Sequence, residues 1–345
     1  MNATPVTEAG DVCWLRSDIA LAAAGRRQAA QLARGICLPE ERVARVELCV
    51  TEMATNLLKY ADDGSLALRV VRAGGHPAVE CLSLDSGPGI DDVHGALRDG
   101  TSASGSLGIG MGAIARLADA SGVHSLPGRG TVVFARFWAE DRIPPPGPVR
   151  TGGLTRPISG EQVCGDTWAV RPLGAPGSDA LLLMMCDGLG HGPLAARVAD
   201  RAREAFRDSG HTSPEAVLQD VHRGLRGTRG AAVAIALADA AGQRVRLSGA
   251  GNIAALVASE DTRSGLLSLP GIVGLQLPRP RTFEAAFPPG AALVMHSDGL
   301  SDRWKPADFR GLFAQDPALA AAQILNQAAV RRDDAGIVVA LHRRP

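Results

Sequence analysis

The chain is 345 residues long, which exceeds the usual size of one hydrophobic core and predicts two domains. Its apolar fraction of 46% is ordinary for a globular protein, but aromatic residues make up only 3%, so the cores must be mainly aliphatic. Basic and acidic residues both number 36, which leaves no positive excess for a nucleic acid backbone or an anionic membrane, and we expect neither partner.

The first part of the chain has the pattern of an α/β layered domain. Helices are predicted from about Ser17 to Arg34 and again after Pro39, where apolar residues recur at helical spacing from Val43 to Leu58. Strands are predicted at Leu66 to Val71, Val79 to Leu84 and Thr131 to Phe137. A further helix, near Ala113 to Ala120, follows a glycine-rich stretch.

Three polar and glycine-rich patterns lie within this domain. Glu52 and Asn56 are four residues apart, so they share one helix face, although an exposed polar stripe on an amphipathic helix gives the same pattern. The sequence DSGPGI begins at Asp85 after a strand, and GSLGIGMG begins at Gly105 before a helix. Glycine permits close backbone approach and helix N-termini favour anions, so the second run can hold phosphates.

Taken in order, E-x-x-x-N, D-x-G-x-G, G-x-G-x-G and a final GRGT resemble the ATP-binding fold of the GHKL class, particularly the anti-sigma-factor serine kinases similar to RsbT and RsbW. The resemblance covers about Ser17 to Trp138. It implies ATP and Mg²⁺ as cofactors, with Asp85 on the adenine amino group and Glu52 accepting the proton of a substrate serine. It further implies that Asn56 holds the ATP-bound Mg²⁺ and that Gly87 and Gly89 shape the base pocket. The backbone of Gly108, Gly110 and Gly112 would lie along the phosphates, and Thr131 would support the adenine.

Clustered prolines in AEDRIPPPGPVRTG, after Trp138, favour an extended spacer. The sequence therefore predicts domains over residues 1–139 and 154–345, joined by a proline-rich linker over 140–153. Predicted strands outnumber helices in the second domain, which indicates largely antiparallel sheets covered by helices. The predicted strands are Thr167–Val170, Ala180–Cys186, Ala231–Ala238, Arg244–Leu247, Ile253–Val257, Ala291–His296 and Ile337–Leu341, with helices after Gly192, Ser213 and Pro317.

Short aspartate motifs recur in the second domain where a strand meets a turn. They are CGDTW, CDGLGHG, HSDGL and RRDDAG, which contain Asp166, Asp187, Asp298, and Asp333 with Asp334. A single Asp-Gly is a common turn dipeptide, but several carboxylates at strand ends can converge, and they repel one another unless a cation neutralises them. All-oxygen ligation favours Mg²⁺ or Mn²⁺, and two bridged ions can activate water against a phosphoryl group. The motifs therefore predict phosphate ester hydrolysis.

These motifs, in this order, resemble the SpoIIE and RsbX branch of the metal-dependent serine phosphatases over roughly Thr155 to Leu341. The resemblance implies that Asp187 bridges two metals and that the Gly188 carbonyl completes one site. The other implied carboxylate ligands are Asp166, Asp298 and Asp333, with Asp334 as a further candidate.

Three features of the motifs leave questions open. His191 is either a general acid or a residue that caps or positions the loop at a helix start. Gly336 stands where the resembled family commonly has a hydroxyl residue, which leaves the geometry of that loop undefined. No phosphate-binding arginine is identifiable from the sequence.

The fold class expected from both halves is α+β in two domains, a GHKL-type α/β sandwich followed by a metal-dependent phosphatase-type α-β-β-α sandwich. The combined resemblance implies a partner-switching regulator that acts on STAS-domain phosphoproteins of the anti-anti-sigma or stressosome type, with a sigma factor or downstream phosphatase as a further partner. In one alternative, the first domain binds a partner in a nucleotide-dependent way without transferring phosphate. In another, the phosphatase domain is an inactive scaffold.

The compartment is predicted from cysteines and hydropathy. The six cysteines form no C-x-x-C pair and lie mostly in apolar runs, which favours buried thiols in a reducing environment. Glu8 and Asp11 precede the first apolar stretch, unlike a signal peptide, and no run approaches the ~20 apolar residues of a membrane span. We expect a cytoplasmic protein.

Overall fold

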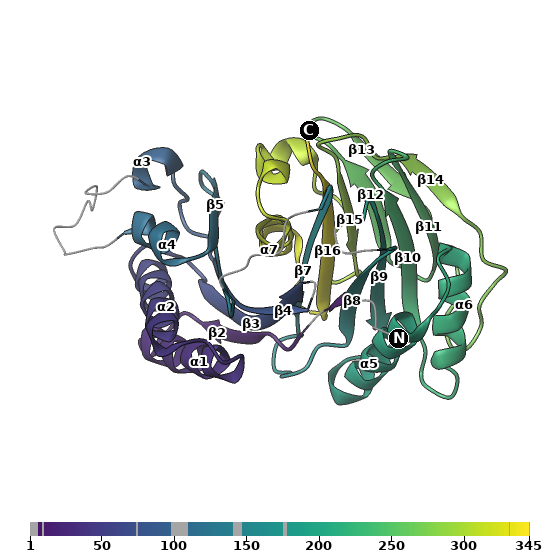
Figure 1. Ribbon diagram of the computed structural model, residues 1–345, viewed down its shortest axis with the longest axis horizontal. Coiled ribbons are helices and arrows are strands. Elements are labelled where there is room, and N and C mark those ends of the chain that lie inside the picture. The colour runs from purple at the N-terminus through teal and green to yellow at the C-terminus, as the bar shows by residue number, and fades with distance from the viewer. Residues whose placement is uncertain are drawn as a thin grey trace. The chain divides into compact units, whose positions relative to one another are not determined.

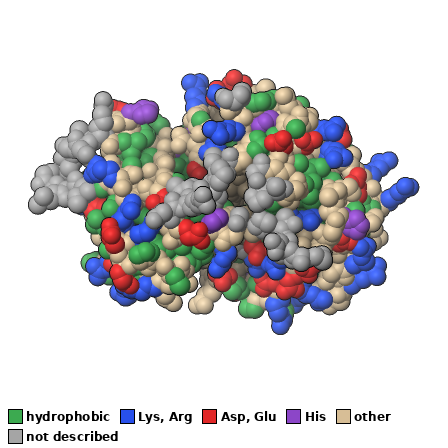
Figure 2. Space-filling model, viewed as in Figure 1, with side chains coloured by type: hydrophobic (Ala, Val, Ile, Leu, Met, Phe, Trp, Pro, Cys, Tyr) green, Lys and Arg blue, Asp and Glu red, His purple; other side chains and the backbone are tan. Residues whose placement is uncertain are grey.

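The computed structural model describes residues 6–8, 10–73, 75–97, 110–140, 147–174, 178–330 and 332–344. The chain divides into two compact units: residues 10–144 form the N-terminal unit, and residues 1–9 with 145–345 form the C-terminal unit. No helix in these described ranges is long and apolar enough to cross a membrane. On the face shown in Figure 2, basic and acidic side chains are interspersed, without one dominant basic patch.

The N-terminal unit is a five-stranded antiparallel sheet with helices on one face (Figure 1). The strand order is β2-β3-β4-β6-β5, with bounds Cys13–Arg16, Ser65–Ala73, His76–Leu84, Gly130–Trp138 and Ala120–Leu126. The helices are α1 (Leu21–Gly35), α2 (Glu40–Tyr60), α3 (Val93–Leu97) and α4 (Met111–Leu117). This arrangement confirms the predicted α/β sandwich.

Helix α2 forms because its apolar residues share one face and its first turn is acidic. Val43, Val46, Val50 and Leu57 are buried against the sheet in one continuous core. Pro39 precedes the helix, and glutamates in the first turn complement the positive end of the helix dipole. The helix predicted after Pro39 is therefore confirmed.

A buried ionic cluster joins three neighbouring strands of this sheet. Arg69 on β3 pairs directly across from Glu80 on β4, which pairs in turn with Arg136 on β6. Arg69 Nε donates to Glu80 Oε1 at 2.8 Å, and Arg136 Nη2 donates to Glu80 Oε2 at 2.7 Å. Burial alone would raise the pKa of Glu80, but the charges of the two arginines outweigh it and hold that pKa below its usual value.

The C-terminal unit consists of two antiparallel sheets packed face to face and flanked by helices (Figure 1). The first sheet has the order β1-β8-β9-β10-β11-β14, with bounds Thr7–Glu8, Asp166–Pro172, Ala180–Gly188, Ala231–Asp239, Arg244–Ala250 and Phe283–Ala286. The second has the order β13-β12-β15-β16-β7, with bounds Arg263–Leu266, Ala254–Ala258, Ala292–His296, Ala335–His342 and Val149–Arg156. The helices are α5 (Gly192–Asp208), α6 (Pro214–Gly224) and α7 (Pro317–Ala328), with 3₁₀ turns at Pro306–Phe309 and Leu312–Ala314.

Strand β9 shows why this unit is layered. Leu183 and Met185 face the core between the two sheets, whereas Leu182 and Met184 face the core beneath α5 and α6. A strand buried on both faces must be apolar throughout, which explains its uninterrupted apolar sequence. The predicted α-β-β-α sandwich is confirmed.

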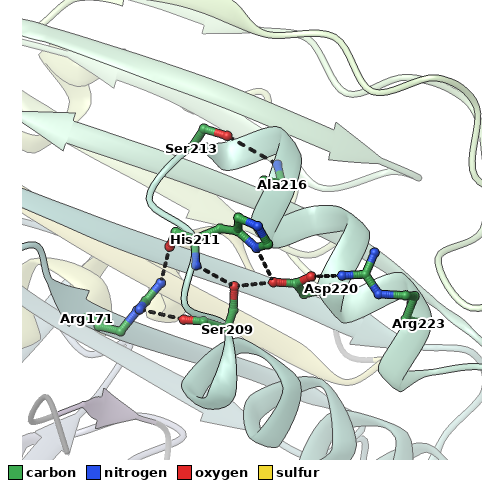
Figure 3. A network of polar contacts seen from close by, with 7 residues as sticks. All are labelled: Arg171, Ser209, His211, Ser213, Ala216, Asp220 and Arg223. Atoms are coloured by element: carbon green, nitrogen blue, oxygen red, sulfur yellow. Dashed lines mark hydrogen bonds and ion pairs between the residues drawn. The ribbon is translucent and has the colours of Figure 1, made fainter.

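A polar network fixes the corner between α5 and α6 to strand β8 (Figure 3). The Arg171 guanidinium donates to the carbonyls of Ser209 and His211, at 2.8 and 2.7 Å. The Asp220 carboxylate accepts from Ser209 Oγ at 2.5 Å and contacts His211 Nδ1 at 2.7 Å. Ser213 then caps α6. The helix that begins directly beside the aspartate motifs is thereby held at its far end.

The structure corrects the predicted linker. Residues 149–156 form β7, which pairs along its whole length with β16, so the expected linker over 140–153 ends earlier. Gly152 and Gly153 have linker-like composition, but they serve close packing. A Cβ on Gly152 would lie 2.5 Å from the Ala318 backbone nitrogen, and one on Gly153 would lie 2.6 Å from the Trp168 ring.

A second difference concerns the start of the chain. Thr7 and Glu8 pair with Val170 and Ala169 as the edge strand of the C-terminal unit, although the sequence places them in the first domain. The Arg207 side chain on α5 also donates to Glu8 at 2.8 Å. A two-residue strand has no periodicity, so the sequence carried no signal for it.

We expect Glu80→Gln to lower the free energy of unfolding of the N-terminal unit by about 3 kcal/mol, because the buried Arg69 and the partly buried Arg136 lose their counter-charge. Since the folded pKa of Glu80 lies below the unfolded value of about 4.3, its contribution is present above that value and is lost as the pH falls through the folded pKa. The difference between wild type and variant should therefore shrink below about pH 4.

Urea unfolding of the full chain measures this difference, with hydrogen exchange of β3 and β4 assigning the transition. Glu40→Gln is the control, because Glu40 pairs with Arg34 at an exposed site and its loss should not change the transition. Equal stability of Glu80→Gln and wild type at pH 7 would contradict the role given to the cluster.

Candidate functional site

Four aspartates of the C-terminal unit lie at one end of its two sheets. Asp166 begins β8 and pairs directly with Asp187 near the end of β9. Asp298 follows β15, and Asp333 precedes β16, the neighbour of β15. A hydrogen bond from Ser297 Oγ to Asp166 Oδ2, at 2.5 Å, joins the two sheets at this end. The structure therefore brings the aspartates predicted from the four motifs together.

Burial and mutual repulsion raise the pKa values of these carboxyl groups. Burial is the largest cause for Asp166, whose pKa lies well above its usual value, and the charge of Asp187 adds to it. Burial also raises the pKa of Asp187 to about 7, with further contributions from Asp298 and Asp333. The pKa of Asp298 is raised by burial and by Asp333. A divalent cation would relieve this repulsion.

The donor set fits a hard cation by its chemistry. The converging groups are carboxylates, which are hard oxygen donors. The Gly188 backbone, next to Asp187, lies against α5, since a Cβ there would be 2.8 Å from the Ala195 carbonyl. Within the described ranges, no three acidic, cysteine or histidine side chains are already close enough to enclose a metal. The arrangement is thus an open set of oxygen donors and not a closed cage.

Two neighbouring side chains orient the aspartates. Ser297 Oγ donates to Asp166 and accepts from the Gly336 backbone nitrogen at 3.0 Å. Asn252 Nδ2 donates to Asp298 Oδ2 at 2.6 Å from the loop between β11 and β12. Neither residue was predicted from the sequence. Ser297 directly precedes Asp298 in its motif, which is a usable signal, whereas nothing local marks Asn252.

Asp334 has a different role from Asp333. Its carboxylate accepts from the backbone nitrogens of Ile158 and Gly165, each at 2.7 Å, so it holds the β7–β8 loop. Asp333 contributes charge to Asp187 and Asp298, whereas Asp334 contributes charge to Asp187 and Asp166. The backbone hydrogen bonds of Asp334 thus distinguish it from Asp333, the ligand that the resemblance implies.

The glycines beside the aspartates are required for space. None of Gly165, Gly188, Gly299 and Gly336 has a positive φ. A Cβ on Gly299 would lie 1.8 Å from the Asp334 carbonyl oxygen, and one on Gly336 would lie 2.9 Å from Asp166 Cβ. The departure from a hydroxyl residue at Gly336 therefore has a steric reason, and the Asp-Gly pairs reflect crowding more than turn chemistry.

His191 stands at the start of α5, and its side chain makes no capping hydrogen bond. Its Nδ1 lies 3.1 Å from Glu161 Oε1, and more than half of its side chain is exposed. Glu161 in turn lies against Gly192, where a Cβ would meet its Oε1 at 2.8 Å. The general-acid role of His191 stays a prediction.

The N-terminal unit places the predicted adenine-binding residues at one corner. Asp85 follows β4, and its Oδ1 accepts from the backbone nitrogens of Gly87 and Thr131, at 2.8 and 3.2 Å. Burial raises the pKa of Asp85, while these two hydrogen bonds lower it. Gly89 has a φ of 75° and lies so close to Leu126 that a Cβ would meet its carbonyl oxygen at 2.4 Å.

The remaining predicted nucleotide residues lie on two helices. Glu52 and Asn56 are one turn apart on α2, and burial raises the pKa of Glu52. Gly110 directly precedes α4, and Gly112 lies in its first turn. Gly108, also expected along the phosphates, lies outside the described residues. Ser125 was not predicted from the sequence, although its Oγ accepts from the Ile90 nitrogen at 2.7 Å and contacts Thr131 Oγ1 at 2.8 Å.

Comparisons with known proteins follow the same division. Residues 15–137 match the family model of the histidine kinase-like ATPase domain, and residues 177–341 match that of stage II sporulation protein E (SpoIIE). The serine/threonine-protein kinase RsbT of Bacillus subtilis (strain 168) is 35% identical over 95 residues, which are 28% of this chain and 71% of RsbT.

Two solved structures resemble the chain over 56% of its length. One belongs to the bacterial stressosome, described as a modular system adapted to control secondary messenger signalling, with 30% identity, a TM-score of 0.50 and 98% of that chain covered. The other is RsbX in complex with magnesium, with 18% identity, a TM-score of 0.48 and 94% of that chain covered. Through its N-terminal unit the chain belongs to the RsbT serine/threonine-protein kinase family, and it joins this ATPase domain to a SpoIIE phosphatase domain of the PP2C type.

Proposed function

We propose that the protein is a bifunctional partner-switching regulator. Its C-terminal unit removes phosphate from phosphoserine or phosphothreonine in a protein, with Mg²⁺ or Mn²⁺, and its N-terminal unit binds ATP and phosphorylates serine or threonine. The observation that carries the proposal is the convergence of Asp166, Asp187 and Asp298 from two sheets, with pKa values raised by burial and repulsion. Such a cluster suits a charge-neutralising cation at a phosphoryl-transfer site.

In the phosphatase reaction, two bound cations would supply a nucleophilic water at neutral pH and neutralise phosphoryl charge. Asp187 and the Gly188 carbonyl would help to hold these cations. The other ligands would be Asp166, Asp298 and Asp333. Ser297 and Asn252 fix two of these carboxylates through the hydrogen bonds described above, so the ligands are oriented before any substrate arrives.

In the kinase reaction, bound ATP with Mg²⁺ would supply the phosphoryl group. Asn56 would hold the ATP-bound Mg²⁺, and Asp85 would bind the adenine amino group while its backbone partners keep it in place. Glu52 would accept the proton of the substrate hydroxyl, and the raised pKa of its carboxyl group favours that task.

The proposed substrates are STAS-domain proteins of the anti-anti-sigma or stressosome type. This proposal is supported by the relationship to the kinase RsbT and by the likeness to a stressosome chain. A sigma factor or a downstream phosphatase would receive the output. If both units act on one STAS protein, their opposed activities set its phosphorylated fraction.

Asp187→Asn should reduce the Mn²⁺-dependent rate of dephosphorylation of a phospho-STAS protein about a thousand-fold, because the shared ligand loses its charge. Asp208→Asn, at the exposed end of α5, is the charge-matched control and should retain the wild-type rate. Circular dichroism checks that both variants fold. Full activity of Asp187→Asn would remove the proposed metal chemistry.

Asn252→Ala should weaken Mn²⁺ binding about 10- to 100-fold, since Asp298 loses the donor that orients it. Isothermal titration calorimetry measures the affinity without any substrate. Thr262→Ala serves as the control, because Thr262 pairs with Ser259 at the far end of β12. An unchanged Mn²⁺ affinity in Asn252→Ala would show that this amide does not support the metal site.

Glu52→Ala should abolish transfer of label from γ-labelled ATP to a STAS protein while leaving ATP binding intact, because only the proton acceptor is lost. Glu47→Ala, on the same helix, should transfer label normally. Undiminished transfer by Glu52→Ala would contradict the kinase assignment of this residue. Nucleotide-dependent complex formation without transfer by wild type would instead identify the N-terminal unit as a binding module.

A further inference from the structure

Arg229 lies in the loop between α6 and β10, next to the loop that follows Asp187. The residue after it, Gly230, accepts a hydrogen bond from the Leu189 backbone nitrogen at 3.1 Å. One position further, Ala231 pairs directly with Gly188. Arg229 is therefore held beside the CDGLGHG motif by backbone pairing, although its own sequence surroundings contain no recognisable motif.

The Arg229 side chain extends over this motif at a glycine. Its Nη1 lies 3.3 Å from the point where a Cβ on Gly190 would stand, and Gly190 has a φ of 94°. Residue 190 thus both needs the left-handed conformation and leaves room for the guanidinium. The arginine is exposed, so water and solutes reach it.

The guanidinium is not used to stabilise the fold. Across the described ranges, no side chain or carbonyl forms a hydrogen bond or ion pair with it, and the aspartates of the candidate metal site lie beyond ion-pair distance. In contrast, Arg171 is engaged by two carbonyls at the α5–α6 corner. The donors of Arg229 are therefore available beside the CDGLGHG motif without being neutralised by an acidic side chain.

The loop that carries Arg229 is rigidly built. Thr228 Oγ1 donates to the Leu225 carbonyl at 2.7 Å and accepts from the Gly230 nitrogen at 3.0 Å. Gly230 has a φ of 81° and packs against Ile272, where a Cβ would lie 2.5 Å from Cγ2. These contacts fix the backbone on both sides of Arg229 before a ligand binds, which reduces the entropy lost on binding.

A planar guanidinium with five donors matches the oxygens of a phosphate, particularly where neighbouring cations already attract the dianion. We infer that Arg229 is the phosphoryl-binding residue of the phosphatase site and contacts the non-bridging oxygens of a phosphoserine or phosphothreonine monoester and of the phosphate product. This inference rests on the proposed phosphatase function and supplies the arginine that the sequence did not reveal.

The test compares Arg229→Ala, Arg229→Lys and the control Arg226→Ala in the full chain. Arg226 is a matched control because it belongs to the same exposed loop and also precedes a glycine, while its charge acts on His222. Calorimetry with Mn²⁺ and then with inorganic phosphate measures the two affinities separately, and steady-state kinetics on a phosphoserine peptide give KM and kcat.

We expect Arg229→Ala to weaken phosphate binding and to raise KM for the peptide about 10- to 100-fold each, the range for one charge-assisted contact. Arg229→Lys should recover part of the loss, because it keeps the charge without the planar fork. Mn²⁺ affinity should be unchanged in all three variants, and Arg226→Ala should match wild type throughout.

Equal phosphate affinity and equal KM in Arg229→Ala and wild type would overturn the inference. A parallel loss of Mn²⁺ affinity in Arg229→Ala would also overturn it, because Arg229 would then support the metal site and not the phosphoryl group. Failure of the proposed function is a separate result. If Mn²⁺-loaded wild type hydrolyses no phosphomonoester, the proposed activity falls and Arg229 has no role in a phosphatase reaction, whereas a loss of phosphate affinity in Arg229→Ala still identifies it as a phosphate-binding residue.

Discussion

Repulsion among carboxylates is the constraint on which the C-terminal unit depends. Folding must place Asp166, Asp187 and Asp298 together, although burial and like charge both oppose their ionisation. The free energy for this placement comes from elsewhere, from two apolar cores on either side of strands such as β9 and from the hydrogen bonds of two sheets. A well-packed scaffold therefore holds a cluster of carboxylates that lowers its stability. This is expected where residues are selected for binding a ligand and not for stability.

Small residues make this compact end possible. With few aromatics in the chain, glycine and alanine allow strands and helices to approach closely. Gly299 and Gly336 show the effect beside the aspartates, and Gly152 shows it where α7 crosses β7. The N-terminal unit also buries a carboxylate, that of Glu80, and compensates its charge by pairing it with arginines on both neighbouring strands. In both units, a polar group that is costly to bury is matched by a specific neighbour.

The sequence predicted those features whose signal is local. Helix α2 and strand β9 have long, unambiguous apolar patterns, and each aspartate motif lies where a strand meets a turn, so both sandwich folds and the grouping of the aspartates could be foreseen. Strand β5 (Ala120–Leu126), rich in small and polar residues and half-exposed, lacks such a pattern and was not predicted. Asn252 and Arg229 could not be found either, because their relation to the site depends on strand register and loop packing.

The pairing of β1 with β8 makes the N-terminal unit an insertion within the C-terminal one. Thr7 and Val170 are partners although 163 positions separate them, so during synthesis β1 cannot pair until all the residues between them have been made. The inserted unit is consequently tethered at both ends, and a single cut in the segment after it leaves it attached. Removing the first ten residues would convert β8 into an open sheet edge, a surface that pairs readily with other chains. Separating the two units thus requires keeping this strand with the C-terminal part.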